Sequence, residues 1–384
     1  MEATRQKPSA TRADSGRSEL NDIIDAARRK DNARLEEIGA WRYLRFTRGF
    51  RFVPVGTAVF GDTVVYGYPK IGRIFRLDRG LQTQFAHPFW VEEKIDGYNV
   101  RVFRHEAEVL ALTRRGFVCP FTTDRIADLM DLRIFEARPD LVVCAEVVGP
   151  DNPYNEAERA PADIPDDVRL FVFDLMRAGS PECLPYRKKV RLVEEFGLPA
   201  VPAHGRFRTD EAQRLSSLML ELDRQVREGV VLKEDSSRDR RAKYVTGSIN
   251  LADVRVSAKA VKQLPPDYFI QRILRLALFM DEHGLPRTPE LYRQLGEGLI
   301  EGIISAARQQ RDHREVSYGF RCRFRRRANA ELLMQTMQKL LGKGQVHQRR
   351  LEKEGEFYVL EFDKVLPKTT GLFAHLLRGG IIYD

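Results

Sequence analysis

The stretch FWVEEKIDGYNVRVF (89–103) brings together residue types that could attack phosphorus, or that could simply form a turn. Lys94 and Asp96 flank one isoleucine, and Gly97 follows. Asp-Gly between alternating apolar runs is a strong signal for a two-residue hairpin, in which Lys94 and Asn99 would be cross-strand neighbours. The pattern K-x-D-G alone does not decide between the two, because it arises by chance in roughly one protein in ten of this length.

A lysine that attacks phosphorus needs particular companions. An unperturbed lysine has a pKa of about 10.4 and is almost wholly charged at neutral pH, whereas only the uncharged amine is a nucleophile. Nearby cations and desolvation lower that pKa, so other basic groups, carboxylates for a metal ion and an aromatic ring for a base are expected. The chain supplies them in short motifs: Arg114 in TRRG, Glu146 in CAEVVGP, Phe171 and Phe173 in LFVFDL, Glu228 and Lys233 in REGVVLKE, and Lys243 in RAKYV.

Each of these residues also has a structural interpretation. Glu146 ends an apolar strand, where an unpaired buried carboxylate is costly, which favours a functional role. Phe171 and Phe173 are predicted on one face of a strand, where either ring could stack on adenine or belong to the core. Phe173 is preferred because it directly precedes Asp174. Lys233 could simply end a strand in solvent, and an arginine on a strand is more often a surface residue.

The series KIDGYNVR, TRRG, AEVVG, FVFDL, EGVVLK and AKYV resembles, in order, the motifs of the covalent nucleotidyltransferase superfamily of ATP-dependent DNA and RNA ligases and capping enzymes. The presence of Asn99 beside the K-x-D-G motif resembles the pattern of the RNA ligases within this superfamily. The DNA ligases and capping enzymes carry a β-barrel after the last motif, whereas this chain turns helical near Lys262. The whole arrangement resembles the homodimeric ATP-dependent RNA ligase family best known from archaea.

The resemblance implies a role for each matching position. Lys94 would be the catalytic residue that takes AMP from ATP and passes it to an RNA 5′-phosphate, before a 3′-hydroxyl seals the strand. Mg²⁺ or Mn²⁺ is implied, with Glu146 and Glu228 as metal ligands. Arg241 occupies a place where the family usually has a further lysine, which leaves open which cation does what. The residues expected around the nucleotide are Glu93, Ile95, Asn99, Arg101, Arg114, Glu146, Phe173, Val230, Lys233 and Lys243.

The helices and strands expected around these residues predict an α+β fold. In this fold, an adenylyltransferase domain of mixed sheets with flanking helices carries the motifs. Ser18 is predicted to cap a helix that places Ile23, Ile24, Ala27, Leu35 and Ile38 at apolar positions. Short β-rich runs follow to about Phe85. The predicted segments are a flexible tail (1–17), an N-terminal helix and β-rich module (18–86), the adenylyltransferase domain (87–257), a helical dimerisation domain (258–313) and a C-terminal α+β domain (314–384).

The last third of the chain is predicted from its periodicity. A helix ending at Gly284 should place Ile270, Ile273, Leu274, Ala277 and Met280 on one face, and Thr288 with Pro289 should open the next helix. Its apolar positions suggest a homodimer interface. The end of the chain reads as β-α-β-β-α, with alternation in SYGFRCRFR. The basic run Arg321–Arg327 could bind RNA or form a solvated sheet face.

The composition fits a polyanionic partner. Among 384 residues, 64 Lys and Arg against 55 Asp and Glu give a formal charge of +9, which favours binding to phosphates. The four cysteines form no close pair, and no apolar run approaches the ~20 residues needed to span a membrane, so a cytoplasmic protein with reduced thiols is expected. A DNA ligase, a capping-type guanylyltransferase and a non-catalytic RNA-binding relative remain as alternatives.

Overall fold

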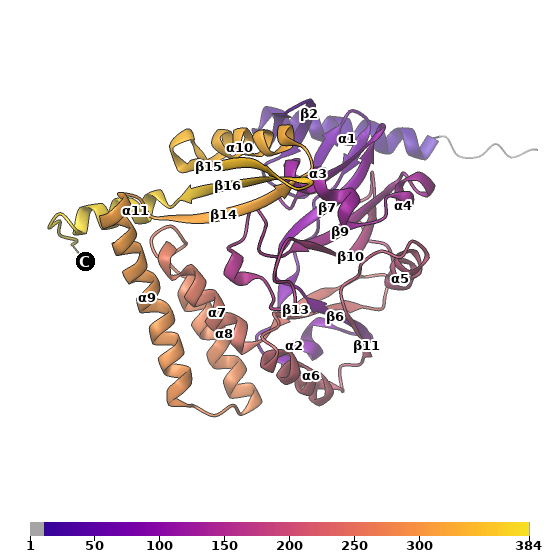
Figure 1. Cartoon of the computed structure of the whole chain (residues 1–384). Helices are drawn as coiled ribbons and strands as arrows, with labels where there is room; N and C mark the ends of the chain where they lie inside the picture. The colour runs from indigo at the N-terminus through magenta and orange to yellow at the C-terminus, as the bar shows by residue number, and fades with distance from the viewer. Residues whose placement is uncertain (1–10, 384) are drawn as a thin grey trace, which may run out of the picture.

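The computed structural model describes residues 11–383, with side chains from residue 20 onward. The helices are α1 Thr11–Arg29, α2 Leu77–Gln84, α3 Pro120–Leu129, α4 Arg133–Ala137, α5 Tyr186–Glu195, α6 Ala212–Arg224, α7 Gly247–Ser257, α8 Tyr268–His283, α9 Pro289–His313, α10 Arg327–Leu341 and α11 Pro367–Leu376. The strands are β1 Ala33–Ile38, β2 Trp41–Phe46, β3 Ala58–Phe60, β4 Thr63–Val65, β5 Gly72–Arg73, β6 Phe89–Lys94, β7 Tyr98–His105, β8 Glu108–Thr113, β9 Leu141–Val148, β10 Arg169–Arg177, β11 Ala203–Phe207, β12 Gly229–Glu234, β13 Arg241–Val245, β14 Ser317–Phe324, β15 Val346–Glu354 and β16 Phe357–Val365. Figure 1 shows their arrangement.

The N-terminal part departs from the prediction in two ways. Residues 1–10 of the predicted tail lie outside the described residues, but residues 11–17 belong to α1, so Ser18 is inside a helix and not at its cap. The predicted helix also ends early. Asp31 has a positive φ of 55°, and the residues after it form β1, which pairs with β2 across a turn at Gly39. Helix and strand periodicity are hard to separate when Leu35 and Ile38 are the apolar residues concerned.

The K-x-D-G motif does not form a hairpin, and that prediction is wrong. Strand β6 belongs to a sheet of order β11-β6-β12-β13-β5, whereas β7 belongs to a second sheet of order β10-β9-β7-β8. The chain therefore crosses from one sheet to the other between Lys94 and Tyr98. Lys94 pairs with Gly229 of β12, and Asn99 pairs with Glu146 of β9, so the two are not cross-strand neighbours.

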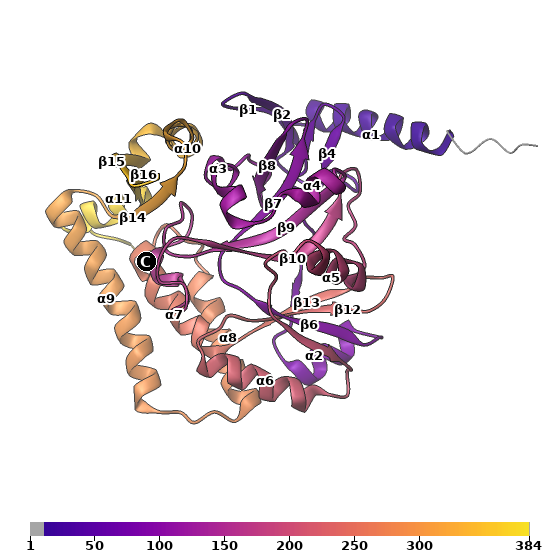
Figure 2. The same ribbon diagram turned by 45° about the vertical axis from the view of Figure 1, so that its right-hand side comes forward.

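The two central sheets are covered by three different parts of the chain. Helices α2 and α6 pack on the outer face of the β6 sheet, in a core that includes Leu81, Met219 and Val230. The N-terminal sheet packs against one side of the β7 sheet through residues such as Phe103. The C-terminal domain packs on its other side, where Phe324 joins the same core as residues of β7 and β9 (Figure 2).

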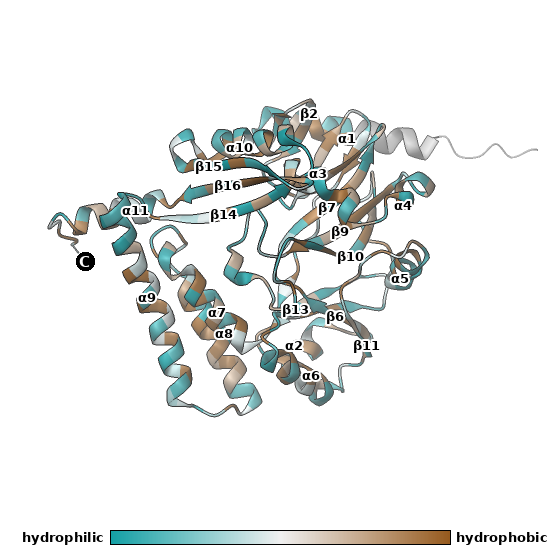
Figure 3. Cartoon of the chain, viewed as in Figure 1, coloured by the Kyte–Doolittle hydropathy of each residue, from teal (hydrophilic) through white to brown (hydrophobic). Residues whose placement is uncertain are grey.

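The helices after the catalytic sheets expose apolar side chains. The predicted apolar face of α8 points outward: Ile270 is 65% exposed, whereas Leu276 and Phe279 pack inward from the other side. Figure 3 shows the hydrophobic residues along the ribbons of α8 and α9. Two helix boundaries are as predicted, because Gly284 ends α8 in the left-handed region and the Thr288 hydroxyl accepts a hydrogen bond from the Leu291 amide. Exposed apolar side chains of α8 and α9 include Ile270, Ile273, Leu274, Tyr292 and Ile300.

The end of the chain has the predicted β-α-β-β-α order, β14-α10-β15-β16-α11, with the sheet order β14-β16-β15. Gly342 follows α10 with a φ of 109°, which explains why the helix stops there. From residue 11 to residue 383, the helices are all too short or too polar to cross a membrane.

Candidate active site

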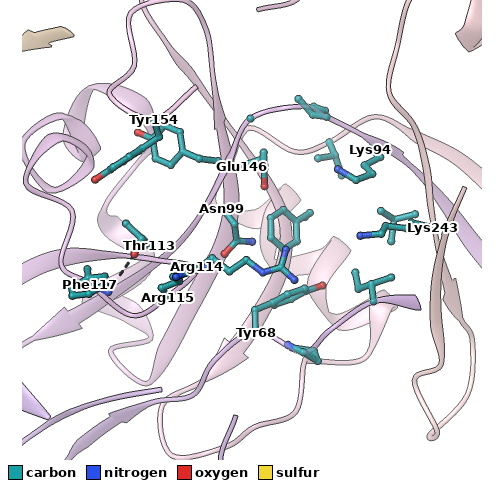
Figure 4. A pocket seen from close by; sticks show the side chains of 18 of the residues that line it. Tyr68, Lys94, Asn99, Thr113, Arg114, Arg115, Phe117, Glu146, Tyr154 and Lys243 are labelled. Carbon is teal, nitrogen blue, oxygen red and sulfur yellow. Dashed lines mark hydrogen bonds between the residues drawn. The ribbon is translucent and has the colours of Figure 1, made fainter. Parts of the chain in front are cut away.

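A cavity of about 520 Å³ lies between the two central sheets. Lys94 of β6 and Lys243 of β13 line it from one sheet, and Asn99 of β7 and Glu146 of β9 line it from the other (Figure 4). Because β6, β12 and β13 are adjacent strands, motifs that are up to 149 residues apart in the sequence meet at this one place. The volume suits a nucleotide-sized ligand.

The side chain of Lys94 is half-buried, and its amine is paired. Its Nζ donates a hydrogen bond of 2.6 Å to Oε2 of Glu228. Burial lowers the pKa of Lys94, but the Glu228 and Glu146 carboxylates outweigh it, so this pKa is raised above its ordinary value. The expectation that surrounding cations keep Lys94 uncharged is therefore wrong for the protein without a nucleotide. The motif carboxylates dominate its surroundings instead.

Glu146 is a carboxylate held among acidic neighbours. Burial raises its pKa to about 8, Lys94 opposes this rise, and Glu228 and Asp96 add to it. Burial likewise raises the pKa of Asp96 to about 7. Within residues 11–383, three or more His, Cys, Asp or Glu side chains do not gather in a group that could hold a metal ion. Mg²⁺ is usually held by one or two carboxylates together with phosphate oxygens and water, so the hard oxygen donors of Glu146 and Glu228 still fit such an ion.

Lys243 has a depressed pKa. Burial and, after it, the charges of Arg73, Lys94 and Arg114 together lower this pKa to about 8, against the opposing effect of Glu228. Among the described residues, its amine has no hydrogen-bond or ion-pair partner within bonding distance. Arg114 lines the same cavity and is exposed. Two cations are thus available for a phosphate at this end of the cavity.

Asn99 offers an unsatisfied polar atom. Its Oδ1 is buried and has no hydrogen-bond partner among the described residues, although the residue lines the cavity. Such an atom is costly unless a ligand donates to it. Glu93 and Ile95 line the same cavity, as predicted from the sequence. Burial raises the pKa of Glu93, so its carboxyl is more easily protonated than usual.

Lys233 lines the cavity, but its amine is engaged elsewhere. Its Nζ donates to the Phe173 carbonyl at 2.6 Å and lies 2.6 Å from Oε2 of Glu92 and 3.0 Å from Oδ2 of Asp174. Asp174 also pairs with Arg241, which occupies the first of the two lysine places of the last motif. Lys233 and Arg241 therefore belong to one ion network beside the cavity. To bind a phosphate directly, Lys233 would have to leave this network.

Two predicted nucleotide contacts are corrected by the structure. Arg101 is fully buried outside the cavity, where its guanidinium donates to the carbonyls of Tyr66, Gly56 and Thr113. It joins the β7 sheet to the N-terminal module. Val230 faces the α2 and α6 core, and its neighbour Val231 lines the cavity, because side chains alternate along a strand.

Comparisons with known proteins identify the family of this chain. Residues 87–245 match the family model of RNA ligase, and residues 256–380 match that of the ligase Pab1020 C-terminal region. A solved structure from Aquifex aeolicus, named provisionally as an ATP-dependent DNA ligase, is 47% identical with a TM-score of 0.89, covering 94% of this chain and 100% of its own. An archaeal ATP-dependent RNA ligase is 27% identical with a TM-score of 0.82, covering 94% and 96%. The chain belongs to the ATP-dependent RNA ligase family, with a Pab1020-type C-terminal region.

A curated relative supports the same extent of similarity. An uncharacterized protein of Methanocaldococcus jannaschii is 27% identical over 328 residues, which cover 84% of this ligase and 83% of that protein. The similarity therefore extends beyond the residues that carry the six motifs and includes the helices and the C-terminal domain.

The C-terminal domain of the ligase contributes a wall that the sequence did not predict. Side chains of α10 line the cavity opposite the β6 sheet, and Tyr68 and Phe173, whose ring centroids are 5.2 Å apart, add an aromatic part. Phe171 does not line the cavity, in agreement with the choice of Phe173. A helix stripe of leucine and methionine is the ordinary pattern of a core-facing helix, so no signal marked it as a ligand wall. The α10 residues concerned are Leu333, Thr336, Met337 and Leu340.

The basic run Arg321–Arg327 of the ligase is largely neutralised. Arg321 and Arg323 both pair with Asp151, at 2.7 Å and 2.8 Å, and Arg325 pairs with Asp128 and with Glu356. Asp151 and Asp128 belong to the catalytic part of the chain. These arginines therefore fix the C-terminal domain to the catalytic sheets.

Proposed function

We propose that this ligase joins RNA 5′-phosphate and 3′-hydroxyl ends through a covalent Lys94–AMP intermediate. The position of the Lys94 amine carries the proposal, since it lies in the cavity between the two sheets and beside Glu228 and Glu146. In the first step the Nζ lone pair attacks the α-phosphorus of ATP, the bond to the bridging oxygen breaks, and pyrophosphate leaves. The amine loses a proton in this step, so it must first give up the charge that Glu228 stabilises.

The next two steps use the same intermediate. An RNA 5′-phosphate oxygen attacks the α-phosphorus and releases Lys94, which yields RNA carrying AMP at its 5′ end. A 3′-hydroxyl then attacks the RNA phosphate, a phosphodiester bond forms, and AMP leaves. Each step exchanges one phosphorus–ligand bond for another, so no further reactant is needed.

The other cavity residues bind and orient the nucleotide in this proposal. Lys243 and Arg114 hold the α-phosphate, the unsatisfied Asn99 carbonyl oxygen accepts from the nucleoside, and Phe173 stacks on the base. The α10 wall excludes water, which strengthens the electrostatic contacts inside. A bound Mg²⁺ or Mn²⁺ would supply charge neutralisation for the phosphates, held by Glu146 and Glu228.

The test is transfer of label from ATP to the protein. Incubation with ATP labelled at the α-phosphate should label the wild-type chain, and Lys94→Ala should abolish the label with an unchanged circular dichroism spectrum. Lys188→Ala removes an exposed lysine of α5 and should label like wild type. Persistent labelling of Lys94→Ala would refute the assignment. Labelled GTP in place of ATP distinguishes a guanylyltransferase.

Joining of DNA ends is a second candidate, favoured by the name of the Aquifex aeolicus relative. The archaeal relatives are named as RNA ligases, and the Pab1020-type region occupies the place where the sequence lacks a β-barrel. Sealing of 5′-phosphorylated RNA and DNA of equal sequence, at equal concentration, decides between them. Preference for DNA would reject RNA as the substrate.

We also propose that the chain forms a homodimer through residues 258–313, the segment predicted from the sequence to be a helical dimerisation domain. The exposed apolar side chains of Ile270, Leu274 and Ile300 support it, since a monomer would leave them in water. Sedimentation that finds only monomer at micromolar concentration would reject the dimer.

A further inference from the structure

A second cavity, of about 360 Å³, adjoins the proposed nucleotide site. Glu228 and Asp96 line it, so it meets the first cavity at the Lys94–Glu228 ion pair. Its other wall comes from the helical segment, through α7 and α8. Strand β5 contributes Arg73, which is paired in register with Lys243 of the nucleotide site.

Four arginines and four carboxylates line this cavity, and one of the carboxylates, Glu228, is already paired with Lys94. Arg159 is the best satisfied, since it pairs with both Asp253 and Glu156. Arg272 shares Asp253, to which its Nε donates at 2.9 Å. Asp253 of α7 is therefore shared between two arginines.

Two further arginines have no carboxylate partner among the described residues. Arg275 donates from Nε to the carbonyl of Gln271 at 2.9 Å, which occupies one of its five N–H groups. The Nη1 of Arg73 is buried with no hydrogen-bond partner within residues 11–383. Arg272 lies three residues before Arg275 on α8, so both guanidinium groups project from one face of the helix.

The arginines destabilise one another in the protein without a ligand. Burial, Arg73 and Arg272 together lower the pKa of Arg275 to about 10, although Asp253 opposes them. Burial also lowers the pKa of Arg73; Glu228 opposes this effect, and Arg272 adds to it. Like charges gathered in a partly desolvated space are stabilised when an anion enters, and guanidinium groups match phosphate oxygens in geometry.

We propose that Arg73, Arg272 and Arg275 bind a phosphate group next to Lys94. The identity of the ligand in this inference rests on the proposed function, because two phosphate groups must reach Lys94 in that reaction. One is the β,γ-phosphate pair of ATP, which leaves as pyrophosphate. The other is the 5′-phosphate of RNA. In either case the helical segment, which replaces a β-barrel after the last motif, supplies the arginines of α8.

Binding is measured by titration calorimetry on the full chain without ATP. The ligands are inorganic pyrophosphate and short RNAs of one sequence with either a 5′-phosphate or a 5′-hydroxyl. Arg275→Gln and Arg73→Gln keep a polar side chain but remove the charge. The matched control is Arg287→Gln, which changes an exposed arginine in the loop between α8 and α9.

The expected result is at least tenfold weaker binding of one ligand in both cavity variants, with Arg287→Gln equal to wild type. Weaker pyrophosphate binding assigns the site to the leaving group of ATP, and loss of the preference for a 5′-phosphate assigns it to RNA. The proposal would be overturned if, for each ligand, the dissociation constants of all variants equalled that of the wild type. Arg275→Lys, which keeps the charge, provides a second test if Arg275→Gln fails to fold. Because no catalysis is required, a wild-type chain that takes no label from ATP would refute the proposed function but leave this measurement decisive.

Discussion

Gly97→Ala tests whether the crossing between the two sheets positions Lys94. A Cβ added at Gly97 would lie 2.4 Å from the Val147 carbonyl oxygen and 3.0 Å from Cγ of Glu146. Ordinary contact begins at 3.4 Å, so the crossing and β9 must separate by about 1 Å. The obstructing atom is backbone and cannot rotate away. A displacement of this size at a reacting group costs ~100-fold in rate.

The expected result is a ~100-fold slower single-turnover transfer of AMP to the protein, with a loss of ~1–3 kcal/mol in the free energy of unfolding. The rate is measured with labelled ATP, and stability is measured by urea unfolding. Gly371→Ala is the matched control, because a Cβ there meets nothing within 4 Å and its exposed position lies inside α11. This control should keep the wild-type rate and gain up to ~1 kcal/mol. A wild-type rate in Gly97→Ala would refute the reasoning.

Two other predictions concern the elements around the site. Arg101→Lys keeps the buried charge, but the lysine cannot reach the three carbonyls that Arg101 binds. The variant should therefore lose ~1–3 kcal/mol in the free energy of unfolding and keep the wild-type KM for ATP. A tenfold higher KM at unchanged stability would restore the nucleotide role of Arg101. The pKa of Asp174 is about 2, because Lys233 and Arg241 outweigh the effect of burial. Its stabilising contribution is therefore complete above its ordinary pKa of 3.8 and is lost as the pH falls through 2. Asp174→Asn should remove about 2 kcal/mol of this acid sensitivity, and urea unfolding curves that shift equally with pH in both proteins would contradict it.

Residues of the site were predictable where their motif lies on a strand that faces the cavity. Lys94, Glu146 and Lys243 come from three strands, and each carries a charge where a buried strand should have none. The conflict between residue type and surroundings is visible in the sequence alone. Their electrostatic effect on one another is not, because the distance between Lys94 and Glu228 depends on the pairing of β6 with β12.

The errors come from contacts between distant segments. Asp-Gly statistics describe local turns, so they could not tell that β6 and β7 join different sheets. Asn99 and Arg101 lie two residues apart on one strand, but the N-terminal module covers only the second. Leu35 and Ile38 fit a helix as well as a strand, and the pairing with β2 decides between them.

The α10 wall has a consequence for the making of the protein. Ribosomes release the chain from its N-terminus, and the catalytic motifs end at Lys243, nearly a hundred residues before the last wall residue, Leu340. A nascent chain that carries every motif therefore still lacks one side of its nucleotide cavity. It also leaves the β7 sheet uncovered on the side where Phe324 and Leu333 pack. If the proposed function holds, a chain that has not yet reached α10 lacks a wall of the ATP site, so such incomplete translation products should not consume ATP.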